Sequence, residues 1–156
     1  MNKTVTIFLL SAVLSTTPAL ADPVSDFISD HNTNRIISGA SEINVSPTIQ
    51  NGKYFYDLQK DIDIIVSEDN GEIKSFCCVC YDDSGVGEFL AQCVTAFYDI
   101  GGIDSYTNCH GELLSEYLSA RAGRETKPNK SVPGVLFQIS KTDNPSRYIF
   151  IIVKVK

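Results

Sequence analysis

The chain has 156 residues, of which 13 are basic and 19 acidic, and its formal net charge is −6. This balance disfavours nucleic-acid binding, which needs a basic surface to meet phosphates, and it disfavours attachment to anionic lipid. An excess of carboxylates would instead speed association with a basic protein.

The first 21 residues have the layout of a cleaved secretory signal peptide. Lys3 is the positive start, an apolar run extends from Val5 to Val13, and Ala19-Leu20-Ala21 is a small-residue cleavage site. The run is shorter than the ~20 residues that a membrane-spanning helix needs. We therefore expect cleavage after this site and an exported protein, in the periplasm or else secreted.

Cleavage would leave residues 22–156 as a mature chain whose length suits one domain with a single core. Because Lys3 is removed with the leader, the mature chain has 12 basic and 19 acidic residues and a net charge of −7. No later segment is apolar for long enough to cross a bilayer, so we expect no membrane insertion after cleavage.

The first part of the mature chain predicts a helix and then a β meander. Asp22 and Pro23 suit the cap and first position of a helix, and apolar residues follow at helical spacing. These are Val24, Phe27, Ile28 and His31. The apolar period then changes to two, over residues 48–50, 53–58, 61–67 and 72–81. Asn51-Gly52 and Asn70-Gly71 are hairpin signals between these strands.

The second part predicts two helices and two strands. Val86, Phe89, Cys93 and Phe97 share one helical face, and Gly101-Gly102 ends that pattern. A second helical pattern runs from residue 105 to 123, and strands follow at 135–141 and 147–156. The last strand is apolar on both faces, which indicates a central strand or one covered by a partner.

This order predicts an α+β domain. We expect an antiparallel sheet, made of the meander and a C-terminal hairpin, with the N-terminal helix and the two central helices packed on it.

All five cysteines follow the predicted leader: Cys77, Cys78, Cys80, Cys93 and Cys109. In the cytosol these residues with His110 would indicate zinc, whereas disulfides are the rule outside it. A redox Cys-x-x-Cys pair belongs at the start of a helix, but here the motif lies in a strand pattern. We therefore expect the domain to be stapled by disulfides.

The strand period limits how the cysteines can pair. Cys78 and Cys80 share one face of their strand, and Cys77 points to the other face with Val79. We expect two bridges from the Cys77–Cys80 cluster to Cys93 and Cys109, and a Cys93–Cys109 bridge is the main alternative. The fifth cysteine is then either buried and inert or available to link two chains.

No motif in the chain predicts a catalytic residue, a cofactor or a metal site. Cys109 and His110 are adjacent, but neighbours on a helix point about 100° apart and do not form a catalytic pair by themselves. Asp61 and Asp63 share a strand face that could bind a cation or a basic partner, although no calcium-loop pattern accompanies them. Tyr54 and Tyr56 also share a face and suit either an interface or the core.

These observations predict a small exported protein-binding module, such as an inhibitor or immunity-type protein against a basic enzyme. The candidate partner-binding residues are Tyr54, Tyr56, Asp61 and Asp63. One alternative is a secreted enzyme whose site combines scattered carboxylates with Cys109 or His110. Another is a secreted effector or structural component that pairs through its C-terminal strand, and a homodimer is also compatible with the sequence.

Overall fold

The computed structural model describes residues 22–58, 61–143 and 146–155. The predicted leader and its cleavage site lie outside these residues. Two helices, α1 (Pro23–Asn34) and α2 (Val86–Arg121), accompany short 3₁₀ turns at Arg35–Ile37 and Asp83–Gly85. The strands are β1 (Thr48–Gln50), β2 (Lys53–Leu58), β3 (Ile62–Asp69), β4 (Glu72–Cys80), β5 (Val135–Asp143) and β6 (Ser146–Lys154).

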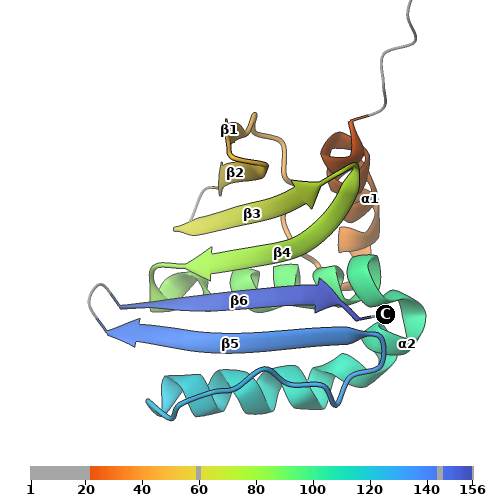
Figure 1. Ribbon diagram of the computed structural model, residues 1–156. Coiled ribbons are helices and arrows are strands. Elements are labelled where there is room, and N and C mark those ends of the chain that lie inside the picture. The colour runs from red at the N-terminus through yellow and green to blue at the C-terminus, as the bar shows by residue number, and fades with distance from the viewer. Residues whose placement is uncertain (1–21, 59–60, 144–145, 156) are drawn as a thin grey trace, which may run out of the picture.

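The six strands form one antiparallel sheet in the order β1-β2-β3-β4-β6-β5 (Figure 1). This arrangement confirms the predicted α+β class and the predicted meander and C-terminal hairpin. Asn51 and Gly52 both have positive φ, 51° and 70°, as the tight turn between β1 and β2 requires. β6 lies between β4 and β5, which confirms that the last strand is interior to the sheet.

Helix α1 begins where the sequence predicts. The backbone amide of Val24 donates to Oδ1 of Asp22 at 3.0 Å, and Pro23 occupies the first turn, where no amide hydrogen is needed. Val24, Ile28 and His31 are buried along one face of the helix. The Phe27 ring packs beside Phe76 of β4, with centroids 6.2 Å apart, and so α1 rests on the sheet.

The two helices predicted on either side of Gly101-Gly102 are joined in α2. The helix kinks at Gly102, whose φ of 78° and ψ of −168° are not helical. A Cβ on Gly101 would lie 2.7 Å from Cγ1 of Val135 and would collide with Ser105, so the absence of a side chain at Gly101 lets the helix pass close to β5. The two glycines therefore redirect the helix along the sheet.

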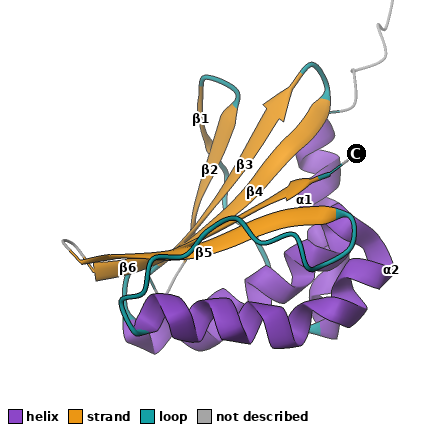
Figure 2. Ribbon diagram, turned by 60° about the horizontal axis from the view of Figure 1, so that its bottom comes forward, coloured by secondary structure: helices purple, strands orange, loops and turns teal. Residues whose placement is uncertain are grey.

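Both helices cover the same face of the sheet (Figure 2). The core lies between them and the helix-facing side chains of the strands, the largest of which are Phe76, Phe137 and Phe150. Among the described residues, no helix combines the length and apolar character needed to cross a membrane.

One edge of the sheet is covered by the segment between α2 and β5. Asn129 and Phe137 exchange two backbone hydrogen bonds, of 2.7 and 3.1 Å, so the outer edge of β5 already has a neighbour. The opposite edge is β1, which is only three residues long. One edge of the sheet is thus short, and the other is bridged at Phe137.

Candidate functional site

The most distinctive surface is the face of the sheet that no described helix covers (Figure 2). Along each strand, side chains on this face alternate with side chains that point into the core. The nonpolar side chains on this face are not part of the buried core between the sheet and the helices. They are Phe55, Ile65, Leu136, Ile149, Ile151, Val153, Cys77 and Val79. We call this surface the open face. Ile151 is its most exposed nonpolar side chain, at 45 %.

The strand register arranges the open face in rows. Phe55 pairs with Ile65, Ile65 with Cys77, and Cys77 with Ile151, so these four residues form a central row across four strands. Neighbouring side chains in such a row contact one another across the strands. The central row is thus a continuous apolar band.

Charges of opposite sign lie on either side of this band. The basic row lies on one side of the central row, two residues away from it along each strand. It consists of Lys53, Ser67, Ser75, Val153 and Leu136. On the other side is the acidic row: Asp57, Asp63, Val79, Ile149 and Ser140. Lys53 and Asp57 are both exposed.

The acidic end of the open face is ordered by side-chain contacts. The hydroxyl of Tyr81 donates to Oδ2 of Asp63 at 2.7 Å, and this hydrogen bond raises the pKa of Tyr81. The guanidinium of Arg147 lies over the Tyr81 ring, 5.8 Å from its centroid. Beside them is a hollow of about 220 Å³ whose lining includes Asp82, Asp83 and Ser146.

The four candidate partner-binding residues are divided between two faces. Asp63 belongs to the open face, and Asp61 precedes β3 with a positive φ of 57° and accepts the amide hydrogen of Tyr81 through its carbonyl. Tyr54 and Tyr56 do share a face, but it is the one toward the helices. Tyr56 is buried in the core, and Tyr54 is packed against it.

The predicted disulfide staple is wrong, because all five cysteines are free thiols. The expected faces are correct: Cys78 and Cys80 are buried on the helix side and Cys77 is half-buried on the open face. Cys78 and Cys93 meet, but as hydrogen-bonded thiols. Cys80 donates to the carbonyl of Asp82, so its thiol is satisfied locally.

Burial also makes these thiols unreactive. It is the main cause that raises the pKa of Cys77 to about 12 and that of Cys109 to about 11, and it raises the pKa of Cys78 and Cys93. A protonated thiol is a poor nucleophile in disulfide exchange. The sequence prediction rested on compartment and face, and it could not include the distances between cysteines on separate elements.

Cys109 and His110 are not brought together as a catalytic pair. The thiol of Cys109 is buried and donates to the carbonyl of Tyr106 at 3.2 Å. His110 is exposed, and its ring meets the edge of Tyr106 at a centroid distance of 5.3 Å. Across the described residues, no group of three or more histidine, cysteine, aspartate or glutamate side chains is gathered to hold a metal ion.

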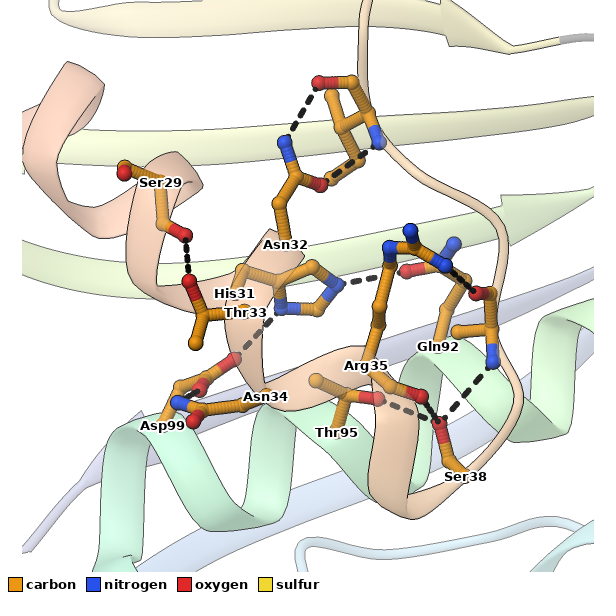
Figure 3. A network of polar contacts seen from close by, with 12 residues as sticks. Ser29, His31, Asn32, Thr33, Asn34, Arg35, Ser38, Gln92, Thr95 and Asp99 are labelled. Atoms are coloured by element: carbon orange, nitrogen blue, oxygen red, sulfur yellow. Dashed lines mark hydrogen bonds and ion pairs between the residues drawn. The ribbon is translucent and has the colours of Figure 1, made fainter.

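A buried polar network, which the sequence did not reveal, joins α1 to α2 (Figure 3). His31 is fully buried, and its Nδ1 lies 2.6 Å from Oδ2 of Asp99, whose side chain is 2 % exposed. Asn34 donates to the other oxygen of that carboxylate at 2.7 Å. The His31 ring also stacks on Phe76 at 5.2 Å. His31 alone was visible in the sequence, as a member of the helical stripe.

The hydrogen bonds of Gln92 determine which atom faces His31. Its amide nitrogen donates to the carbonyl of Ser41 and to Oε1 of Glu88, so its Oε1 accepts from Nε2 of His31 at 2.7 Å. Nε2 therefore donates to Gln92, while Nδ1 contacts the Asp99 carboxylate. With both ring nitrogens engaged and no access to solvent, the histidine is suited to holding the helices together rather than to acid–base catalysis.

Neither a family model nor a curated protein nor a solved structure matches this chain. The candidate site is therefore defined by its own geometry, and its main components are the central, basic and acidic rows of the open face.

Proposed function

We propose that this chain is a protein-binding module and that the open face is its binding surface. The observation that carries the proposal is the central row, a band of nonpolar side chains that lies across four strands with no described element over it. Contiguous apolar surface that is at least partly exposed, as here, is typical of interaction sites. A sheet presents it on an ordered backbone, which reduces the conformational entropy lost on binding.

The charges beside the central row define the surface that would fit. A complementary partner has a nonpolar centre and a cationic group opposite Asp57 and Asp63. A basic enzyme outside the cytosol meets this description, and inhibition of such an enzyme is the role that we propose if the chain is exported to the periplasm or secreted. The acidic balance of the whole chain supports this choice of partner.

The second candidate, pairing through the C-terminal strand, has less support. β6 is hydrogen-bonded to β4 on one side and to β5 on the other, so it offers no free edge. What β6 does offer is its outer side chains, and those belong to the open face.

A photo-crosslinking amino acid at position 151 tests the proposal in the cell that produces the protein. We expect a discrete covalent adduct with a protein, because Ile151 lies in the central row and is exposed. The matched control is position 114, since Leu114 has a similar exposure of 51 % but lies on α2. Equal labelling at both positions, or no adduct at position 151, would contradict the proposal.

A further inference from the structure

We propose that the open face binds a second copy of this chain, so that two sheets pack face to face about a twofold axis along the central row. This inference rests on the proposed function, because it uses the same surface, and it means that a second copy and a basic enzyme would compete for the open face. Two stacked sheets normally lie about 10 Å apart with their strands nearly aligned, and this axis produces that packing.

The symmetry operation brings opposite charges together. Rotation about the central row places each strand over its own equivalent and exchanges the basic row with the acidic row. Lys53 of each copy then faces Asp57 of the other. The two residues are four positions apart on β2, so each lies about 7 Å from the axis, on opposite sides of it. Two equivalent ion pairs result.

The same rotation places nonpolar groups against nonpolar groups in the central row and on β6, whereas Val79 and Leu136 face serines of the other copy. The central row meets itself, so Ile151 packs on Ile151 of the second copy and Cys77 lies near the centre of the interface. In the flanking rows, Val153 of one copy faces Ile149 of the other. The dimer would therefore have a nonpolar centre and a charged rim, which is the usual organisation of a stable interface.

A twofold axis that also lies between the two sheets but runs parallel to β4 gives a poorer fit. It keeps each row in place and exchanges β3 with β6, so Asp63 would face Ile149 of the second copy. A carboxylate against a nonpolar side chain loses its hydration without gaining a partner. Charge complementarity thus selects the axis along the central row.

The edges of the sheet give a second copy little to bind. Backbone hydrogen bonds from Asn129 occupy the outer edge of β5 at Phe137, β6 is paired on both sides, and β1 is three residues long. The repulsion between two acidic chains is weak at this interface, because salt at physiological concentration screens charges beyond about 8 Å. The helices cover the face of the sheet opposite the open face, so they do not obstruct the contact between the two copies (Figure 2).

Sedimentation equilibrium of the purified chain tests this inference. We expect a species of twice the mass of the purified chain. Ile151→Asp should weaken the dimer by about 100-fold or more, because two carboxylates would be buried without partners at the centre of the interface. The control is Leu114→Asp, on the exposed side of α2, which should leave the dissociation constant unchanged. Circular dichroism checks that both variants fold.

A charge exchange provides a test that does not depend on the nonpolar centre. Lys53→Asp and Asp57→Lys should each weaken the dimer about 10-fold, because each creates two like-charge contacts. The double variant restores opposite charges and should recover dimerisation to within about 3-fold of the original. Additive losses in the double variant would overturn the proposed axis.

The crosslink at position 151 separates failure of this inference from failure of the proposed function. An adduct of the chain with itself supports this inference and supports the open face as a protein-binding surface. A chain that stays monomeric at millimolar concentration and forms an adduct with a different protein overturns the inference about the second copy and leaves the proposed function standing. The absence of any adduct at position 151 overturns both.

Discussion

His31 is a buried polar side chain with three kinds of contact. It binds the Asp99 carboxylate at one ring nitrogen and the Gln92 amide oxygen at the other, and its ring stacks on Phe76. Each contact links α1 to another element, since Asp99 and Gln92 belong to α2 and Phe76 to β4. A single side chain therefore connects three parts of the fold.

Replacing His31 with alanine should lower the free energy of unfolding by about 3 kcal/mol, because it leaves the buried Asp99 carboxylate without its main partner. Urea denaturation at neutral pH measures this change. Asp99→Ala should have a similar effect, and the double variant should lose much less than the sum, since the two residues act as one unit.

The control for this prediction lies on the same helix. Thr33 is exposed and its hydroxyl bonds only to the carbonyl of Ser29, so Thr33→Ala should change the stability by less than about 0.5 kcal/mol. A loss of the same size at Thr33 and His31 would show that the helix, rather than the buried network, is what the substitutions disturb.

At the scale of the elements, the kink in α2 determines where the helix lies. Before Gly102 the helix packs near β4 through Cys93, and at the kink itself Gly101 passes close to Val135 at the start of β5. A straight helix of this length would extend past the sheet. The kink keeps both halves over the same layer (Figure 1).

Two glycine substitutions in α2 should have opposite effects. Gly102→Ala should destabilise the protein by about 1–3 kcal/mol, because its backbone conformation is essentially restricted to glycine. Gly111→Ala should stabilise it by up to about 1 kcal/mol, because that glycine is exposed in the helix and a Cβ there meets nothing within 4 Å. Thermal denaturation of the two variants measures both. Equal effects would mean that the kink is not required.

For the whole molecule, burial of tyrosines and cysteines predicts a loss of stability in alkali. Burial raises the pKa of Tyr56 and Tyr148 to about 12 and that of Cys109 to about 11, above ordinary values of 10.0 and 9.0. The unfolded chain therefore loses these protons at lower pH than the folded chain. Their contribution to stability is complete below about pH 9 and is lost as the pH rises toward 12.

Urea denaturation at a series of alkaline pH values measures this loss. Tyr148→Phe should make the decline less steep, because one of the titrating groups is removed. Recovery of the original signal after return to neutral pH controls for chemical damage. A free energy of unfolding that stays constant between about pH 9 and pH 12 would contradict this account.

Much of the fold was predictable because its signals are local. The Asn-Gly turns, the cap at Asp22 and the period of two in β3 act within a few residues, and each led to the correct element. The two-sided apolar pattern of β6 also indicated an interior strand. This pattern in β6 was the only sequence signal of the open face. The central, basic and acidic rows depend on the register between strands that are far apart in the chain.

The site was less predictable, since it depends on distances between elements. The cysteines are on the predicted faces, but whether thiols bond or remain free depends on their relative position and burial, which no spacing encodes. The partners of His31 are 61 and 68 residues away in the chain. Tyr54 and Tyr56 could face either way until the helices were placed, and the helices lie on their side.

The sequence by itself determined the elements, their order, the antiparallel hairpins and the acidic charge, because turn chemistry, hydrophobic period and composition are properties of neighbouring residues. Only the tertiary structure decided which face of the sheet the helices cover, that the thiols stay free, and that a row of Phe55, Ile65, Cys77 and Ile151 lies open between charges of opposite sign. Those outcomes depend on packing between segments distant in the chain.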